Sequence, residues 1–317
     1  MKIGLDAMGG DFAPEVTVQG AILSLDILSE KDRLVLFGKK DLLENLFKQK
    51  GYLRLPKTFE IVNCNEIISM DDDPVKSFME KAESSIVMGF GYLKKGLIDS
   101  FASAGNTGAM LVGAVKVIET IPGIDRPCIS SFVPNDKGQN NLLADVGINA
   151  DPKPENLLEY AILASVFAKN VMNIPEPKVG LMNIGKESSK GNILAKTTYH
   201  ILENSSRINF IGNIEGGDIF KADKVDVIIT DGFTGNVVLK LVESFYNLIK
   251  LRNITDNYFD NFNYENYGGT PILGVNKPVI VGHGKSSALA LKNMIHLSYR
   301  IVESEIINKL KKEFKND

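Results

Sequence analysis

Tryptophan is absent from this 317-residue sequence, which also has only three histidines and two cysteines. Cys64 and Cys128 are far apart and lie outside any CxxC pattern, which argues against a disulfide framework and a zinc cluster and favours a reducing compartment. His200 and His296 fall inside predicted helices, whereas His283 lies between two glycines at a strand end, where it is either a pocket residue or a turn residue. We therefore predict no metal site, and a Ser-His-Asp triad is hard to assemble.

A strong charge imbalance and long hydrophobic runs are also missing. The net charge of -3 gives no support for a nucleic-acid partner, and no run of 18 apolar residues could span a membrane. The first strand-like run starts at residue 2, without a basic region and an apolar stretch that would read as a signal peptide, so we expect none. We expect a soluble, cytoplasmic protein, and peripheral contact with the inner face of a membrane stays open.

Short apolar runs that end in turn residues alternate with helical patterns along most of the chain. The predicted strands cover residues 2–7, 33–38, 58–64, 97–104, 141–147, 178–185, 207–214, 225–232 and 278–284. The predicted helices cover residues 15–29, 74–95, 107–120, 156–171, 192–204, 234–250 and 286–312. This order predicts an α/β protein with a mostly parallel sheet between helices. No clean linker appears, so we expect one catalytic unit over 1–317, and any two lobes would be interleaved in sequence.

Five of the strand ends carry turns rich in glycine, asparagine and serine. They are SAGNTG at 103–108, NIGKESSKGN at 183–192, GNIEGGD at 212–218, TDGFTGN at 230–236 and GHGKSS at 282–287. Taken singly, each is an ordinary turn that caps a helix. Five at the carboxyl ends of strands favour an anion site, because glycine lets backbone amides approach a ligand and helix N-termini attract negative charge. Neither GxxxxGK[ST] nor GxGxxG follows the first strand, so no nucleotide cofactor is predicted.

Taken together, the motifs resemble those of the bacterial phosphate acyltransferases, the PlsX family. They are DAMGGDFAP, MDDDP with KAESS, SAGNTGA, GIDRP, DVGINAD, NIGKESSKGN, FIGNIEGGDI, TDGFTGNVVLK, YGGTPILG and GHGKSS, in the family's order over about residues 1–305. The resemblance implies a three-layer α/β/α fold like those of the phosphotransacetylases and the isocitrate/isopropylmalate dehydrogenases, and a homodimer. It also implies that inorganic phosphate attacks an acyl thioester on acyl carrier protein, giving acyl phosphate for a membrane acyltransferase that acylates glycerol 3-phosphate in phospholipid synthesis.

From the turns and the matching motifs we predict three groups of site residues. The catalytic group is Lys190, Asn183, Asp231 and Asn236. The phosphate-binding group is Ser103, Asn106, Thr107, Gly191 and Asn192. Further pocket residues are Asp6, Gly9, Gly10, Asp11, Lys81, His283 and Ser286. Phosphate is already ionised near neutral pH and a thiol is a good leaving group, so the reaction needs positioned donors more than a strong base.

The chain departs from the family pattern in three places. Met79 stands where arginine is usual, and Ile148 stands where alanine is usual. The segment 245–268 is a shortened, aromatic replacement for a longer lysine-rich hairpin, and we expect it to pack on a partner helix or the core rather than on a membrane. A phosphotransacetylase-like enzyme that uses acyl-CoA, an isocitrate-type dehydrogenase and a non-catalytic scaffold for a membrane acyltransferase are the alternatives.

Overall fold

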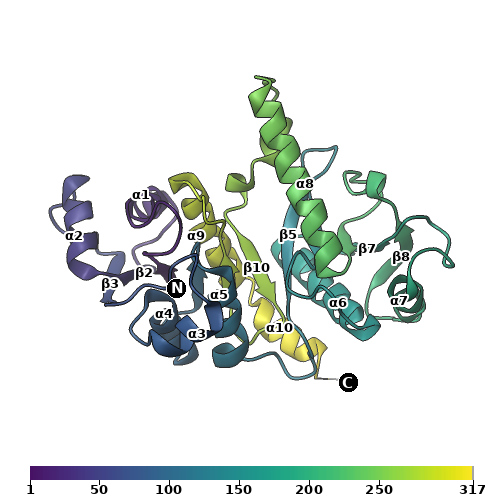
Figure 1. The fold of residues 1–317 in the computed structure, drawn as a ribbon, viewed down its shortest axis with the longest axis horizontal. Coiled ribbons are helices and arrows are strands. Elements are labelled where there is room, and N and C mark those ends of the chain that lie inside the picture. The colour runs from purple at the N-terminus through teal and green to yellow at the C-terminus, as the bar shows by residue number, and fades with distance from the viewer. Residues whose placement is uncertain (316–317) are drawn as a thin grey trace. The chain divides into compact units, whose positions relative to one another are not determined.

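The structure, a computed structural model, describes residues 1–315. Two compact units, each built from two stretches of chain, make up the protein (Figure 1). The first unit contains Met1–Thr120 and Tyr264–Ile307, and the second contains Ile121–Asn263 and the chain from Asn308 on.

In the first unit, six strands form a sheet in the order β3-β2-β1-β4-β11-β10. Their bounds are β1 Lys2–Asp6, β2 Arg33–Gly38, β3 Phe59–Asn63, β4 Ser100–Ser103, β10 Thr270–Leu273 and β11 Val279–Val281. All neighbours are parallel except β10 and β11. Leu34, Val35, Leu36 and Phe37 are all at most 2% exposed. Successive side chains of a strand point to opposite faces, so helices cover both faces of this sheet.

Six helices belong wholly to the first unit. They are α1 Glu15–Leu23, α2 Lys40–Gln49, α3 Pro74–Glu80, α4 Ser85–Lys94, α5 Thr107–Gly113 and α9 Ala288–Glu303. Helix α4 packs on the sheet through edge-to-face contacts of Phe90 with Phe101, and Phe101 in turn meets Phe37. Helices α1 and α9 pack against each other where Gly20 allows close approach to Leu291.

In the second unit, five strands follow the order β5-β6-β9-β7-β8. Their bounds are β5 Cys128–Pro134, β6 Asn140–Ala144, β7 Lys178–Met182, β8 Asn209–Ile214 and β9 Val227–Ile229. Only the pair β5 and β6 is antiparallel. The helices are α6 Pro154–Val171, α7 Ile193–Glu203 and α8 Gly232–Leu251, and α10 Ile306–Glu313 follows α9 near the end of the chain. The predicted α/β fold with a mostly parallel sheet is confirmed.

Several predicted boundaries are wrong for local reasons. The single helix expected over 74–95 is two helices, because Ser84 starts α4 by accepting a hydrogen bond from the Val87 amide. The helix expected over 286–312 breaks at Glu305, whose φ of 52° lies in the left-handed region. Sequence periodicity missed α2, β5 and β10.

The shortened segment after α8 folds back onto that helix. Phe262 is buried in a cluster with Val242 and Tyr246, and the partly buried rings of Phe220, Tyr258 and Phe259 pack against this cluster. Lys250 of α8 donates to Asp260 at 2.8 Å, which links the helix to the segment that follows it. One face of α8 is therefore covered by its own chain. None of the helices within residues 1–315 combines the length and the apolar character that crossing a bilayer requires.

Candidate active site

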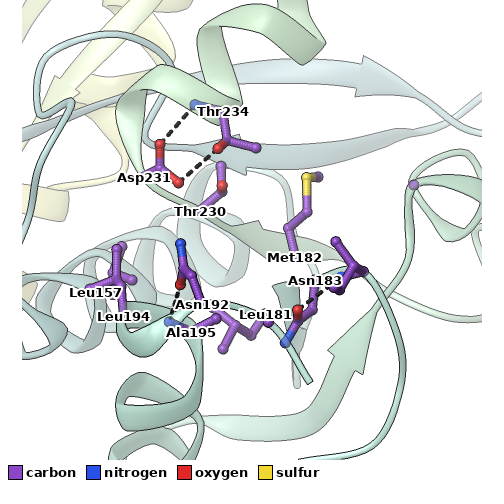
Figure 2. Close-up of a pocket in the computed structure, with 13 residues that line it drawn as sticks. Leu157, Leu181, Met182, Asn183, Asn192, Leu194, Ala195, Thr230, Asp231 and Thr234 are labelled. Carbon is purple, nitrogen blue, oxygen red and sulfur yellow. Dashed lines mark hydrogen bonds between the residues drawn. The ribbon is translucent and has the colours of Figure 1, made fainter. Parts of the chain in front are cut away.

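A cavity of about 450 Å³ lies in the second unit at the carboxyl ends of β7 and β9 (Figure 2). Its lining residues are Leu157, Leu181, Met182, Asn183, Ile184, Gly191, Asn192, Leu194, Ala195, Gly216, Thr230, Asp231 and Thr234. The first turns of α7 and α8 both contribute to its wall. Four predicted site residues, Asn183, Gly191, Asn192 and Asp231, thus meet in one cavity, whereas Thr230 and Thr234 were not predicted.

The start of α7 depends on a tight turn. The Asn192 side chain caps the helix by accepting a hydrogen bond from the Ala195 amide at 2.8 Å. Gly191 has a φ of +91°, and a Cβ there would lie 2.4 Å from Asn183 Oδ1. Asn183 donates from Nδ2 to the Lys190 carbonyl at 3.2 Å and accepts from the Ile184 amide at 2.8 Å. Asn183 therefore fixes the loop in which glycine is required at 191.

Lys190 directly precedes this glycine, two residues before the Asn192 cap of α7. Its side chain is exposed, and it forms no ion pair within residues 1–315, whereas Lys186 of the same loop lies 3.8 Å from Asp218. Asn213 donates to the Glu187 carbonyl at 2.9 Å and anchors the middle of the loop. The ammonium of Lys190 is therefore available to an anion at the edge of the loop.

The start of α8 is capped by Asp231. One of its carboxylate oxygens accepts from the Thr234 amide at 2.8 Å, and the other accepts from the Thr234 hydroxyl at 2.8 Å. Asn236 does not line the cavity; it donates to the Val146 carbonyl at 3.1 Å. A Cβ on Gly235 would lie 1.9 Å from the Asp145 carbonyl oxygen. The first turn of α8 is therefore seated directly on the 145–149 loop.

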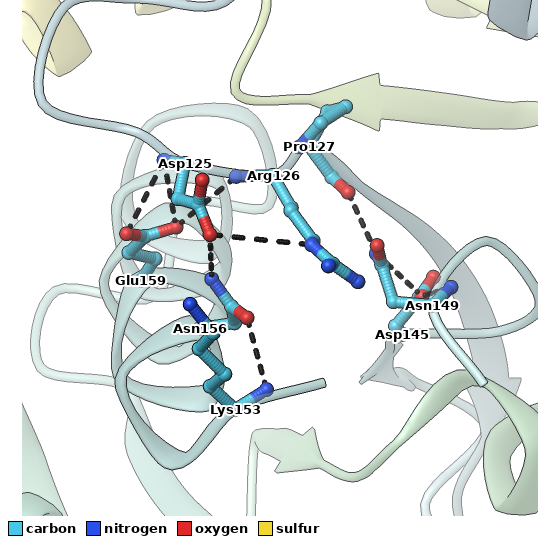
Figure 3. A network of polar contacts seen from close by, with 8 residues as sticks. All are labelled: Asp125, Arg126, Pro127, Asp145, Asn149, Lys153, Asn156 and Glu159. Carbon is cyan, nitrogen blue, oxygen red and sulfur yellow. Dashed lines mark hydrogen bonds and ion pairs between the residues drawn. The ribbon is translucent and has the colours of Figure 1, made fainter. Parts of the chain in front are cut away.

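This loop is organised around the buried carboxylate of Asp145 (Figure 3). Asp145 accepts hydrogen bonds from the Ile129 amide at 3.0 Å and from the Asn149 amide at 2.7 Å. The Asn149 side chain also donates to the Pro127 carbonyl at 2.8 Å, which joins the GIDRP and DVGINAD motifs. Burial raises the pKa of the Asp145 carboxyl above its ordinary value of 3.8, against the opposing effect of these hydrogen bonds. Asp145 stands out in the sequence as an aspartate at a strand end, where it would orient a donor, cap a helix or act as a base, but it is not among the predicted site residues.

A second part of the network in Figure 3 fixes the start of α6. Glu159 accepts from the Asp125 amide, with its Oε2 at 3.2 Å, and the Asp125 side chain accepts from Asn156 at 3.1 Å. Asn156 in turn accepts from the Lys153 amide at 2.9 Å, at the N-terminus of that helix. These contacts hold the helix that carries Leu157, one of the residues lining the cavity.

In the first unit, Asp6 and Ser103 join two of the predicted turns. The Ser103 hydroxyl donates to Asp6 at 2.6 Å and accepts from the Gly105 amide at 2.9 Å. Burial raises the pKa of the Asp6 carboxyl above its ordinary value of 3.8. A Cβ on Gly9 would lie 2.3 Å from Asp6 Oδ2 and 2.7 Å from the Gly105 amide nitrogen. Both side chains are buried, and they hold the turns together.

Asn106 holds the start of α5 against the 69–72 segment. Its Oδ1 caps α5 by accepting from the Ala109 amide at 3.0 Å, and its Nδ2 donates to the carbonyls of Ser69 and Asp72, each at 3.0 Å. Lys81 binds the same 67–72 segment through the Asp72 carboxylate and the Ile67 carbonyl. The hydrogen bond from Lys81 holds the pKa of the Asp72 carboxyl below its ordinary value.

The remaining predicted pocket residues lie where the turn after β1 meets the turn after β11 in the first unit. Gly10 has a φ of +109°, and the Asp11 amide donates to the Gly284 carbonyl at 2.8 Å. His283 Nδ1 accepts from the Lys285 amide at 3.1 Å, and the Ser286 hydroxyl donates to the His283 carbonyl at 2.5 Å. Four predicted residues are exposed: Thr107, at the first position of α5, Asp11, Lys190 and Asn192. Lys190 and Asn192 lie in the second unit and the other two in the first.

Comparison with known proteins identifies the family. The sequence model of the family described as "Fatty acid synthesis protein" matches residues 1–251 and 244–309. The chain is 40% identical to a phosphate acyltransferase of Caldicellulosiruptor saccharolyticus, over 99% of this chain and 98% of that protein. A phosphate acyltransferase of Clostridioides difficile is also 40% identical, over 97% and 94% of the two chains.

Among solved structures, a phosphotransacetylase from Streptococcus pyogenes has the same fold. It aligns with a TM-score of 0.65 and 20% identity over 97% of this chain and 94% of that one. A branched-chain phosphotransacylase from Enterococcus faecalis aligns with a TM-score of 0.64 and 14% identity, over 95% and 99% of the two chains. The predicted phosphotransacetylase-like architecture is thereby confirmed. From the near-complete match to its relatives, we conclude that the chain belongs to the phosphate acyltransferase (PlsX) family and is an acyltransferase.

Proposed function

We propose that the protein transfers an acyl group from acyl carrier protein to inorganic phosphate, releasing acyl phosphate and free carrier for phospholipid synthesis. The observation that carries this proposal is the meeting of two capped helix N-termini, those of α7 and α8, at one cavity. Helix N-termini present unpaired amides and a partial positive charge, which suit phosphate and a developing oxyanion. The name that the relatives carry, phosphate acyltransferase, supports the same reaction.

Within this proposal, the Lys190–Asn192 turn holds phosphate. Lys190 supplies a positive charge, and the amides at the start of α7 supply donors. Asn183 keeps the turn in shape. Asp231 and Asn236 act as positioning residues, because the carboxylate of Asp231 is occupied by Thr234 and the amide of Asn236 binds Val146.

The first unit carries a separate set of predicted residues. Ser103 and Asn106 shape the 103–107 turn through their buried contacts, and the exposed Thr107 at the start of α5 is the candidate anion ligand of this turn. Asp6, Gly9, Gly10 and Lys81 hold the neighbouring turns, and Asp11, His283 and Ser286 are the other residues predicted in this unit. No cofactor takes part in this proposal.

The reaction then needs little acid-base help. A phosphate oxygen attacks the thioester carbonyl carbon, and the carbonyl oxygen becomes an oxyanion. Collapse of this intermediate breaks the carbon–sulfur bond, and the carrier leaves as a thiolate that takes a proton from water. Because the thiol pKa is about 8.5, leaving-group protonation contributes little, and binding and orientation carry most of the rate enhancement.

We also propose a cytoplasmic homodimer that passes its product to a membrane acyltransferase. The face of α8 opposite the aromatic cluster exposes an apolar stripe of Phe233, Val237, Leu241, Phe245, Leu248 and Leu251. These positions recur every three or four residues, so they share one face that fits a second helix. Light scattering of Leu241→Glu would give the monomer mass if this face forms the dimer, while Lys240→Glu, beside it, would keep the dimer mass.

The activity is tested by trapping acyl phosphate with hydroxylamine. Purified protein, saturating phosphate and palmitoyl carrier should give hydroxamate well above a reaction without phosphate, since hydroxylamine also attacks the thioester itself. Thr197→Ala, on the exposed side of α7, should match the wild type. A parallel assay with palmitoyl-CoA separates the two donors: product with CoA but not with carrier would favour a phosphotransacetylase-like enzyme. Absence of hydroxamate with both donors would favour a scaffold.

A further inference from the structure

The cavity has more room than phosphate needs. Its volume is about 450 Å³, and a water molecule in the liquid takes about 30 Å³, so about fifteen water-sized groups would fit. Inorganic phosphate has only five heavy atoms. A second part of the substrate can therefore occupy the same cavity.

The chemistry of the inner wall indicates which part. Leu157 and Leu181, at 1% and 2% exposure, form it together with Leu194 and Ala195, and none of these side chains has a polar atom. In Figure 2, Leu157 and Leu194 lie at the left and Met182 at the right, with Asn192 between them. Thr230, Asp231 and Thr234 lie together above these residues in Figure 2, while Asn192 lies among the apolar side chains. The cavity thus has a polar side and a hydrocarbon side, as sites for amphipathic ligands do.

We propose that the hydrocarbon side holds the alkyl part of the acyl chain, so that side-chain size at Ala195 and Leu194 limits acyl-chain length. This inference rests on the proposed function, since it assigns a subsite of the same cavity. The alternative occupant, the pantetheine arm of the carrier, contains amides whose burial against this wall would leave their hydrogen bonds unmade. An alkyl chain has no such cost and gains from each buried methylene.

The spacing along α7 links the two sides of the cavity. Asn192 caps the helix and Ala195 follows three residues later, on the same first turn. A Cβ on Gly191 would lie 2.9 Å from the Ala195 Cβ, so Ala195 borders the turn assigned to phosphate. A thioester carbonyl that meets phosphate at this turn can direct its alkyl chain past Ala195 toward Leu157.

The test compares chain lengths in Ala195→Phe, which fills the hydrocarbon side and keeps the backbone amide that Asn192 caps. We expect kcat/KM for palmitoyl carrier, relative to octanoyl carrier, to fall at least tenfold. Thr197→Phe, on the exposed side of the same helix, should leave the ratio unchanged. Leu194→Ala should raise the ratio, and thermal melting of each variant checks folding. Ala195→Leu replaces the phenylalanine variant if that one does not fold.

An unchanged ratio in Ala195→Phe, or an equal loss for both chain lengths, would overturn the inference. Binding of non-hydrolysable thioether analogues of the two acyl carriers reads the same subsite without turnover, and the same tenfold discrimination should appear in Kd. A wild type that binds these analogues with the expected discrimination but forms no acyl phosphate would contradict the proposed function alone. A wild type that is active, with variants that do not discriminate, would contradict only the subsite.

Discussion

Asp231 and Thr234 form a closed pair: the backbone amide and the hydroxyl of Thr234 donate to the two different oxygens of the Asp231 carboxylate, each at 2.8 Å. An N-cap that satisfies the first turn in this way stabilises a helix by about 1 kcal/mol. Both residues line the cavity, so the cap also fixes the position of the wall.

The first prediction concerns this pair. Asp231→Ala should lower the free energy of unfolding by about 1 kcal/mol, because the first turn of α8 loses its acceptor. Asp231→Asn, which keeps one acceptor, and Thr234→Val, which keeps the amide, should each lose less. Urea unfolding measures the change in the free energy of unfolding for each of the three variants. Equal stability of wild type and Asp231→Ala would contradict a capping role.

The second prediction concerns the turn before α7. Gly191→Ala should destabilise the protein by about 1–3 kcal/mol, because alanine is strained at a φ of +91° and its Cβ would collide with Asn183. Acyl-phosphate formation should fall in parallel as the turn rearranges. Gly217→Ala is the matched control, since Gly217 has open space around it and no positive φ. Similar melting temperatures for both variants would argue against the strained turn.

The third prediction concerns charge at the edge of the cavity. Lys190→Ala should reduce kcat/KM for phosphate at least about tenfold, or ~1.4 kcal/mol of transition-state stabilisation. Raising the ionic strength should lower kcat/KM for phosphate more in the wild type than in the variant, because salt screens the charge of an exposed cation. Lys186→Ala, whose ammonium lies near Asp218, serves as the control within the same loop. A variant with an unaltered salt dependence would remove Lys190 from the phosphate site.

The fourth prediction concerns pH. Burial raises the folded-state pKa of Asp6 above 3.8, so folding favours the protonated carboxyl. Between 3.8 and the raised pKa the folded state binds more protons than the unfolded state, and this contribution to stability is lost as pH rises. Asp6→Asn cannot titrate, so its stability relative to the wild type should increase with pH across this window and level off above it. The free energy of unfolding of Asp6→Asn and of the wild type, measured from pH 4 upward, tests this. A difference between the two that does not change with pH would refute it.

Periodicity and turn chemistry predict most of the fold because the central strands are buried on both faces. Runs such as Leu34–Phe37 are apolar without interruption, and each ends in a turn residue. Strand β5 was missed because its sequence, CISSFVP, mixes serines with apolar residues, and its antiparallel pairing with β6 interrupts the alternation of strands and helices. The break between α3 and α4 depends on a side-chain cap at Ser84, which periodicity does not reveal.

The candidate site was predictable in its location and less so in its contacts. Asn183, Gly191, Asn192 and Asp231 were found because strand-end turns converge in parallel sheets. The side chains of Ser103 and Asn106 form hydrogen bonds with neighbouring turns. The sequence does not show this, because the bonded residues are distant from each other along the chain. The hydrocarbon wall was missed for the same reason, since Leu157 and Leu181 look like ordinary core residues when read along the chain.

The close approach of Gly235 to Asp145 bears on which wall of the cavity is rigid and which can move. The backbone of Gly235 lies so close to the Asp145 carbonyl that the first turn of α8 has little room to slide, and we expect α8 and the 145–149 loop to keep their relative position. The opposite wall is held differently, by the hydrogen bonds of two side-chain amides, from Asn183 to Lys190 and from Asn213 to Glu187. Such bonds contribute only about 1 kcal/mol each and exchange readily with water. We therefore expect the 183–192 loop, rather than α8, to move when substrate enters and product leaves.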